Sequence, residues 1–589
     1  MNPAARVVPD VASFSVDDGF WYSIPEHLRA DLSVGTIVRV PLSGRRVRGW
    51  VVQLAADREG KLKDVAGISG EAPVFDERLL ESLKWVARHY VAPISVMLAR
   101  SGPPNLPRSI PPQVRPDQGE PGDGRLSGIA SRSATGQSLP VTAVVSNWHD
   151  LRWLSDLGVV LASGHSVLVV AASVAEVEAI RDSTRPFAET VVAVTGHDDA
   201  SDTRAWESAQ SPPRIVIGTP KTATWHIPGL VLAVVLEESR RAMKDRQTPT
   251  MHVRDVMRTR SRVEGFNLVF LGPTPSVELL AAGAEVVRVG NRAWPLVEIV
   301  DRSDDAPGSG YFSERVIAAI HGAVRADRRV FVFTHRRAAH ASLRCAQCRA
   351  LRSCRQCASR IGKVDRCGKC GAAAGPCGVC GGQEFEELGS IPERLVGELD
   401  NRLGRGTVAV HPADTPVTVG TERDLAGLRR IDLAIAADVD GMLLGTGYRT
   451  SEEALRQLAR LASLVGRGRG ARLIAQTAHA DSGLVTALRR GNPIPYLENV
   501  LVDRARDGAP PATEMIAVEL RGDVPPDVSD RLRHLDAAAI VMGPMTVDEG
   551  SRWLLTGRLG KVRLGLRKLV GSWRDKGLTV RVDADPIDV

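Results

Sequence analysis

Short apolar runs alternate with helical segments along the middle of this 589-residue chain, and this alternation restricts the possible folds more than any other feature. A first series between residues 141 and 272 reads VTAVV, SVLVVAA, TVVAV, RIVIG, LVLAVVL and NLVFLG. A second series between residues 329 and 477 reads RVFVFT, TVAV, PVTVG, IDLAIAA and RLIAQT. Near-continuous apolar strands separated by helices are typical of parallel sheets that are covered on both faces. We therefore expect an α/β fold with two successive α/β domains.

The flanking sequence divides into further units. The N-terminal residues combine short β-type runs with a helical stretch over Asp76–Tyr90. Eight prolines with many Gly, Ser and Gln follow, a composition that favours a flexible linker. The last unit is mixed α/β and carries a basic segment expected to be helical near 550–576. The expected units are 1–102, a linker at 103–140, 141–290, 291–490 with an insertion at 341–388, and 491–589.

All eight cysteines lie in four Cys-x-x-Cys pairs: Cys345/Cys348, Cys354/Cys357, Cys367/Cys370 and Cys377/Cys380. Two such pairs on tight turns supply the four thiolates of one tetrahedral zinc site, so the count fits two zinc ions. A disulfide framework is disfavoured in a chain without a secretory signal, and redox pairs are expected singly. The spacing leaves the grouping open between first-with-third and second-with-fourth pairing, or nested pairing.

The charge and hydropathy of the chain indicate its class of partner and its cellular location. The net charge is +7, and ten Lys or Arg residues stand against one acid between residues 336 and 369. The segment 552–581 is also basic, a pattern that indicates nucleic-acid binding against the alternative of two solvated basic faces. No apolar stretch approaches 18 residues, and the first thirty residues lack a signal-peptide pattern. We expect a cytoplasmic protein with no membrane contact.

Several motifs resemble those of one protein family. They are FWYSIP at 20–25, VRVPL at 38–42, WVARHY at 85–90, IGT at 217–219, HVRD at 252–255, TPS at 274–276, FTHRR at 333–337 and VDADP at 582–586. Over essentially its whole length the chain resembles the bacterial PriA family of primosomal replication-restart helicases, of helicase superfamily 2. The cysteine block after the FTHRR motif is the most specific part of this resemblance.

The resemblance implies a fold and a role. It implies two RecA-like helicase lobes with a zinc-binding insertion in the second, an N-terminal domain for DNA 3′ ends and a C-terminal domain. It implies nested zinc ligands, with Cys345, Cys348, Cys377 and Cys380 on one ion and Cys354, Cys357, Cys367 and Cys370 on the other. The implied partners are forked or single-stranded DNA, primosome and replicative helicase-loading proteins, and the single-stranded-DNA-binding protein. The implied location is the bacterial cytoplasm, at the nucleoid.

The nucleotide motifs of such helicases are altered here. A phosphate-binding loop needs glycines, a Lys and a Ser or Thr, yet Ser146-Asn147-Trp148-His149-Asp150 follows the first strand. The Mg²⁺-holding Asp of the second motif is replaced by Leu236, before Glu237, and Ser239 stands at its His position. The arginine-finger motif is reduced to a basic turn with Arg467 and Arg469. We assign no catalytic or nucleotide-binding residue and expect no bound ATP or Mg²⁺.

The competing prediction is an active ATP-dependent 3′–5′ DNA helicase with a diverged nucleotide site. The resemblance over both ends of the chain disfavours a third class, a zinc-ribbon regulator without a role at forks. We therefore predict a DNA-binding primosome component that recognises branched or stalled forks and directs replication restart without ATP hydrolysis.

Both ends of the chain carry candidate DNA contacts. The family's F-D-Y pattern, whose acid contacts a terminal nucleotide, reads Phe20-Trp21-Tyr22 here, so base stacking replaces that contact. The alternative is that Trp21 and Tyr22 pack in a small β-core. The basic segment near the C-terminus favours phosphate contact over a solvated helix face, through Arg558, Lys561, Arg563, Arg567 and Lys568.

Overall fold

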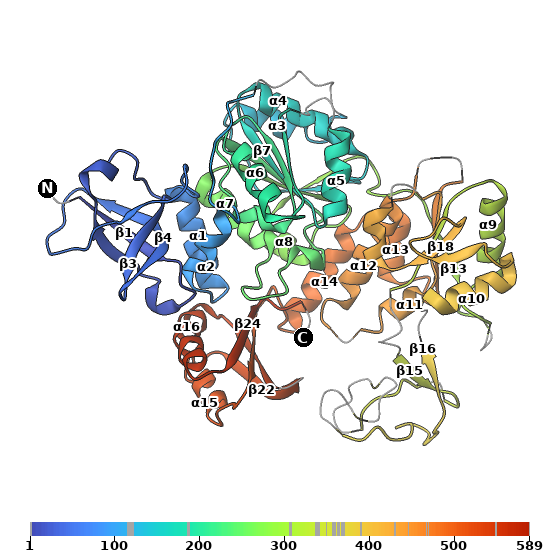
Figure 1. Ribbon diagram of the computed structural model, residues 1–589. Helices are drawn as coiled ribbons and strands as arrows, with labels where there is room; N and C mark the ends of the chain where they lie inside the picture. Colours follow the sequence, from blue (N-terminus) through green and yellow to red (C-terminus); the bar gives the residue numbers. More distant parts are fainter. Residues whose placement is uncertain are drawn as a thin grey trace.

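Four β-sheets and one two-stranded hairpin organise the described part of the chain (Figure 1). The structure is a computed structural model. It describes residues 3–587 except 115–122, 185–188, 306–308, 336–341, 349, 356–360, 362–365, 367–371, 389–391, 429–430, 446, 467, 469 and 548–549.

The N-terminal residues form a five-stranded antiparallel sheet in the order β2-β1-β4-β3-β5, followed by two helices. One face of the sheet buries a small core that includes Val7, Tyr22 and Val38. The side chain of Asp76 accepts the Leu79 N–H and caps the first helix. The elements are β1 (Ala4–Pro9), η1 (Phe14–Val16), β2 (Phe20–Ser23), η2 (Glu26–Leu28), β3 (Ile37–Leu42), β4 (Arg45–Ala55), β5 (Gly67–Ile68), α1 (Glu77–His89) and α2 (Ile94–Ser101).

The segment expected to be a flexible linker is partly ordered. It contains α3 (Ser127–Ala134), whose Ile129 and Ala130 are buried against the next domain. Asn267 of that domain binds the end of α3, because its amide donates to Ser133 Oγ at 2.9 Å and to the Gln137 carbonyl at 2.8 Å. The prediction of a linker is therefore wrong for α3, whose few apolar residues all lie on the buried side.

Lobe 1 is built on a seven-stranded parallel sheet in the order β12-β6-β11-β10-β7-β9-β8. Its strands supply alternate residues to two cores, so that Val167 and Val169 pack on one face while Leu168 and Val170 pack on the other. Helices cover both faces, as near-continuous apolar strands require. The elements are β6 (Thr142–Val145), η3 (Leu151–Leu157), α4 (Gly158–Ala162), β7 (Ser166–Val170), α5 (Val174–Ser183), β8 (Val191–Val194), α6 (Asp199–Ala209), β9 (Ile215–Gly218), η5 (Pro220–Thr224), β10 (Leu230–Leu236), η6 (Arg241–Met243), α7 (Val253–Glu264), β11 (Asn267–Gly272), α8 (Val277–Ala281) and β12 (Glu285–Arg288).

Lobe 2 is built on a six-stranded parallel sheet in the order β13-β20-β19-β14-β18-β17. Together the lobes confirm the expected pair of α/β domains. The cysteine segment is inserted between β14 and α10 of lobe 2, and Figure 1 shows its strands β15 and β16 below the lobe. The elements are β13 (Val297–Asp301), α9 (Glu314–Arg325), β14 (Val330–Phe333), β15 (Ser342–Cys345), β16 (Phe385–Leu388), α10 (Pro392–Leu403), β17 (Val408–Val410), β18 (Val417–Gly420), η8 (Glu422–Gly427), β19 (Leu433–Ala436), α11 (Val439–Met442), α12 (Thr450–Ser463), β20 (Arg472–Thr477), α13 (Gly483–Arg490) and α14 (Ile494–Arg506).

The C-terminal domain is a four-stranded antiparallel sheet in the order β22-β23-β21-β24, with two helices. Two expectations change here. Helix α14 lies beyond residue 490 yet belongs to lobe 2, because Leu497 and Val500 are buried in its core. Residues 550–557 form a strand rather than a helix, since Trp553 and Leu555 alternate toward the core. The elements are β21 (Glu514–Arg521), α15 (Val528–Arg533), β22 (Ile540–Val547), β23 (Gly550–Gly557), α16 (Gly560–Asp575) and β24 (Thr579–Ala584).

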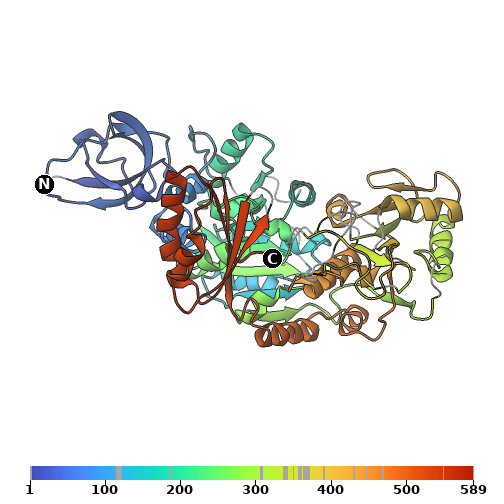
Figure 2. The ribbon, with the colours of Figure 1, turned by 90° about the horizontal axis from the view of Figure 1, so that it is seen from below.

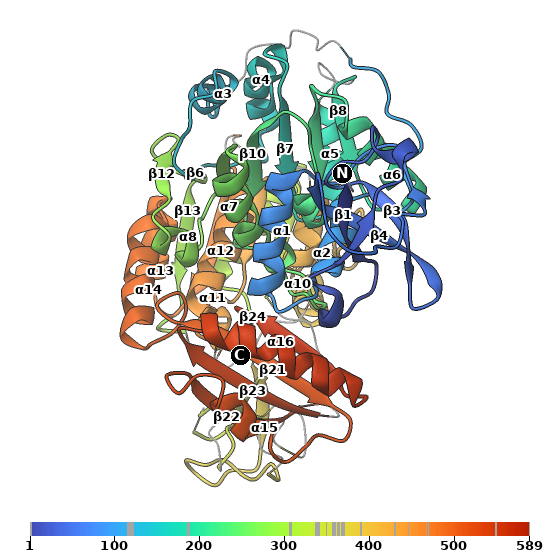
Figure 3. The same cartoon turned by 90° about the vertical axis from the view of Figure 1, so that its left-hand side faces the viewer.

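A single apolar core joins the N-terminal domain, one face of lobe 1 and the C-terminal domain. The three lie side by side in Figures 2 and 3, with α1 between lobe 1 and α16. Polar contacts reinforce this junction: His89 Nε2 lies 2.8 Å from Asp585, and Arg563 donates to the His89 carbonyl at 3.0 Å. Arg567 pairs with Asp17. Two of the five basic residues expected to contact phosphate therefore hold domains together.

Within the described ranges, no helix combines the length and the apolar character that crossing a membrane requires.

The ordering of α3 is testable through Asn267. Replacing this buried residue by Ala removes the amide that binds Ser133 and Gln137, at a cost of about 1–3 kcal/mol. We expect limited proteolysis to cleave near α3 faster in Asn267→Ala than in wild type. Gln137→Ala is the matched control, because only the backbone carbonyl of Gln137 takes part. Equal cleavage of both variants would show that α3 does not depend on this contact.

Candidate metal centre and inter-lobe cleft

Four cysteines meet beside the β15–β16 hairpin. Cys345 ends β15, and the Sγ atoms of Cys345, Cys348, Cys377 and Cys380 all lie within 4.8 Å of one another. The Cys345–Cys380 Sγ distance is 3.4 Å and the Cys348–Cys377 Sγ distance is 3.5 Å. Tetrahedral zinc with Zn–S bonds of about 2.3 Å places its sulfur atoms about 3.8 Å apart. The cluster therefore has the dimensions of a Cys₄ metal site.

Backbone N–H groups favour the thiolate form of two of these cysteines, Cys345 and Cys377. The N–H groups of Cys380 and Val379 donate to Cys377 and lower its pKa to about 6. The N–H of Cys348 likewise lowers the pKa of Cys345. Gly382 lies so close that an added Cβ would stand 2.9 Å from the Cys345 sulfur, so this turn requires glycine. Thiolates without a nearby cation are costly, and a divalent metal ion supplies that charge.

The second group of cysteines is only partly visible. Cys354 is buried beside Ile361. Its three expected companions, Cys357, Cys367 and Cys370, lie outside the described residues. The described cysteines thus form one cluster that could hold one metal ion. These four are the first and last pairs of the block.

The phosphate-loop position of lobe 1 holds buried side chains. Trp148 is buried, and its ring lies 4.1 Å from the ring of His149 between centroids. Burial lowers the pKa of His149 to about 4, so the imidazole is neutral where a helicase carries a lysine. Asn147 donates its amide to the Ser463 carbonyl of lobe 2 at 2.6 Å. The loop is followed by the 3₁₀ helix η3 and not by an α-helix N-terminus that could bind phosphate.

A network of buried ion pairs, the cleft network, lies between this loop and lobe 2, beside a cavity of about 1060 Å³ whose lining includes Trp148, Glu176 and Leu425 of lobe 2. Glu176 at the start of α5 accepts from Arg240 at 2.6 Å and from Arg460 of α12 at 2.8 Å. Glu237, which follows β10, lies 3.4 Å from Arg240 and 3.5 Å from Arg460. Burial alone would raise the pKa of Glu176, but Arg240 and Arg460 outweigh it and hold this pKa at about 2. Glu176 is therefore charged, and the two arginines beside it offset that charge.

Lobe 2 extends the cleft network with its own acids. Arg456, one turn before Arg460 on α12, binds Glu422 through two contacts of 2.6 and 2.8 Å. Arg456 also binds Glu453 at 2.6 Å. The guanidinium of Arg460 lies 3.8 Å from Glu422. The cleft network thus joins carboxylates of both lobes through the arginines of one helix.

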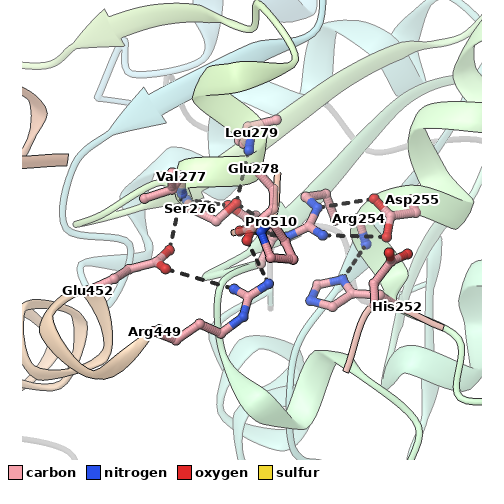
Figure 4. Close-up of polar contacts among 12 residues, drawn as sticks. His252, Arg254, Asp255, Ser276, Val277, Glu278, Leu279, Arg449, Glu452 and Pro510 are labelled. Atoms are coloured by element: carbon pink, nitrogen blue, oxygen red, sulfur yellow. Dashed lines mark hydrogen bonds and ion pairs between the residues drawn. The ribbon is translucent and has the colours of Figure 1, made fainter. Parts of the chain in front are cut away.

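A second buried network, the hinge network, links the lobes farther along the same interface (Figure 4). Glu278 of α8 in lobe 1 contacts Arg449 at 2.6 Å, Arg504 of α14 at 3.0 Å and Arg254 of α7 at 3.5 Å. Glu452 of lobe 2 pairs with Arg504 and accepts the Val277 N–H at 3.1 Å. Figure 4 shows Arg449 and Glu452 pointing from lobe 2 toward the start of α8.

The N-terminal aromatic strand divides its three residues between core and surface. Tyr22 is buried, and its hydroxyl donates to the Pro41 carbonyl at 3.3 Å. Trp21 is half-buried, with the Arg58 guanidinium 4.2 Å from its ring centroid, and Phe20 is 41% exposed. The structure therefore places Tyr22 in the core and leaves Phe20 and Trp21 accessible.

Apart from Glu237, the acids of the cleft and hinge networks were not revealed by sequence patterns. Glu176, Glu278 and Glu422 belong to no motif, and their arginine partners lie far away in the chain. The altered loop at 146–150 and the replacement of the Mg²⁺-holding Asp by Leu236 were the signals that this cleft differs from a nucleotide site. Arg467 and Arg469 of the reduced arginine motif lie outside the described residues.

The cleft network can be tested with Arg460→Met. The substitution leaves Glu176 and Glu237 buried with one guanidinium fewer, and breaking such a pair costs about 3–5 kcal/mol. We expect a lower midpoint of urea unfolding followed by tryptophan fluorescence. The control is Arg506→Met, which removes an exposed pair with Asp503 and should cost about 1 kcal/mol or less. Equal losses in the two variants would contradict a stabilising cleft network.

The grouping of the cysteines can be tested by metal analysis. Nested pairing of two zinc ions predicts that Cys377 and Cys354 hold different ions, so Cys377→Ser and Cys354→Ser should each lower the zinc content from two ions per chain to one. The double variant should hold none. Gln347→Ala is the control, since this side chain lies 3.8 Å from the Cys380 sulfur without being a ligand, and it should retain both ions. A single zinc ion in the wild-type protein would refute the count.

Comparisons with known proteins agree with the N-terminal fold. Residues 6–103 match the family model described as the 3′ DNA-binding domain (3′BD) of PriA. The chain is also 35% identical over 86 residues to the replication restart protein PriA of Bacillus subtilis. This match covers 14% of the present chain and 11% of that protein.

Similarity to solved structures is weaker. Helicase Lhr of Mycobacterium smegmatis, solved with ssDNA and AMP-PNP, is 14% identical with a TM-score of 0.37, covering 76% of this chain and 60% of its own. The yeast DEAD-box splicing factor Prp28 is 10% identical with a TM-score of 0.21, covering 62% and 81%. TM-scores this low do not establish a shared arrangement. The chain therefore joins a PriA-like 3′ DNA-binding domain to two α/β lobes and a four-cysteine cluster.

Proposed function

We propose that the chain is a DNA-binding component of replication restart that recognises branched or stalled forks without hydrolysing ATP. The observation that carries this proposal is the match of residues 6–103 to the PriA 3′ DNA-binding domain. The cleft network supports the second half of the proposal, because its arginines are already paired with carboxylates at the place where a helicase of this kind binds nucleotide.

In the proposed DNA contact, the exposed aromatic residues bind bases by stacking. Trp21 and Phe20 offer ring surface at the edge strand of the sheet, and stacking contributes about 1–3 kcal/mol per base. Arg58 already lies on the Trp21 ring, so its charge is available to a phosphate beside the stacked base. Stacking is tolerant of sequence, as a protein that binds any fork requires.

Electrostatics in the cleft oppose nucleotide binding. A triphosphate needs unpaired cations, yet Arg240 and Arg460 already neutralise Glu176 and Glu237. The position of the Mg²⁺-holding Asp is taken by Leu236, which is buried at the end of β10. Electrostatic stabilisation of the transferring phosphoryl group is the main catalytic resource of such enzymes. Its loss favours a scaffold over a motor.

The cysteine segment supplies the other half of the proposed scaffold. We propose two zinc ions, with Cys345, Cys348, Cys377 and Cys380 on one and the remaining four cysteines on the other. Zinc would fix the shape of a segment that projects from lobe 2 (Figure 1). Its proposed contacts are primosome and replicative helicase-loading proteins, with the single-stranded-DNA-binding protein as a further partner at the nucleoid.

ATP turnover separates the scaffold from the competing motor. We expect zinc-loaded protein to bind forked DNA with an affinity that falls as salt rises, and to show the same background ATP hydrolysis with and without the fork. The measurement is phosphate release beside fluorescence anisotropy on the same samples. Fork-stimulated turnover that Glu237→Ala abolishes would replace the scaffold by the helicase. Absence of any fork binding would remove both.

A further inference from the structure

The β3–β4 hairpin of the N-terminal domain is a rigid basic projection. Its strands are joined by Ser43 and Gly44, whose φ values of 47° and 80° are those of a tight two-residue turn. Residues 32–56 contain Arg39, Arg45, Arg46 and Arg48 and no Asp or Glu.

The register of the hairpin places three of these arginines on one face. Arg39 lies directly opposite Arg48, and Pro41 lies opposite Arg46. The neighbouring residues Val38 and Val40 point to the other face and are fully buried in the small N-terminal core. A slip of one residue would expose these valines, so burial fixes the arginines outward.

The four arginines are exposed, and none has a side-chain hydrogen bond or ion pair within the described ranges. Like charges directly opposite each other in a sheet destabilise it. The arginines at the domain junctions differ, because Arg563 and Arg567 are both matched with acids. The hairpin therefore carries positive charge that no described acid neutralises and that does not stabilise the fold.

We propose that this hairpin binds the phosphate backbone of the DNA, as a second contact apart from Trp21. The inference rests on the proposed function. In the order β2-β1-β4-β3-β5, the Trp21 strand and the Arg39 strand are three spacings apart, about 14 Å. A B-form strand presents about four phosphates over that length. A guanidinium group can donate two parallel hydrogen bonds to the oxygens of one phosphate. The match to a DNA-binding domain favours DNA over an acidic protein as the partner.

The two contacts have different salt signatures, and this difference gives the test. The Arg39→Gln/Arg48→Gln variant removes two phosphate contacts and should lower the slope of log affinity against log salt by about 1.4–1.8. A fourfold rise in salt would then cost about tenfold less affinity than in wild type. Trp21→Ala should weaken binding at every salt concentration with the slope unchanged, because stacking releases no counterions. Fluorescence anisotropy on forked DNA measures all three proteins.

The matched control is Arg29→Gln/Arg204→Gln, which removes the same charge from two exposed arginines outside the hairpin. Its slope should stay at the wild-type value. The melting temperature of the hairpin variant should not fall, since only like-charge repulsion is removed.

Three outcomes would overturn the proposal. They are an unchanged slope in the hairpin variant, an equal decrease in the control, or a fall in melting temperature that accounts for the lost binding. Wild-type protein that binds no DNA would instead remove the proposed function itself, and this inference with it.

Discussion

Pairing of buried charge between the two lobes is the constraint on which the rest of the arrangement depends. Carboxylates and guanidiniums lose their hydration in the cleft, and only their mutual contacts at 2.6–3.5 Å offset that cost. Because Glu176 and Arg460 come from different lobes, their contact holds only at one relative position of the two sheets. A helicase motor moves its two lobes between several relative positions of similar energy, whereas a scaffold needs only one such position.

The remaining chemistry is placed so that it does not require the cleft. The aromatic strand and the arginine hairpin lie on the N-terminal sheet, and the cysteine cluster lies in the insertion of lobe 2. Each has its own source of order, which is a small apolar core in one case and a set of converging thiols in the other. The proposed DNA and metal contacts therefore do not depend on nucleotide chemistry in the cleft.

The sequence predicted most helices and strands, but it did not predict which charged side chains pair between distant parts of the chain. Apolar runs such as SVLVVAA predicted strands because parallel sheets bury both faces. The pairing of Glu176 with Arg460 joins residues 284 positions apart and leaves no periodic trace. The surrounding prolines masked α3 in the sequence, and the basic residues around 550–576 masked the strand at 550–557. Cysteine spacing left the grouping open, whereas the folded hairpin brings the outer pairs together.

The apolar core shared by three domains has a consequence for the architecture as a whole. Leu83 and Val86 of α1, Met257 of α7 and Leu566 of α16 belong to the same buried cluster, although they span most of the chain. A fragment cut after residue 102 would expose its helices to water, so the N-terminal domain is not a detachable module. Damage to the last helix would be felt at the opposite end of the sequence, where the proposed DNA contacts lie. The folded structures of the first and last domains therefore depend on each other.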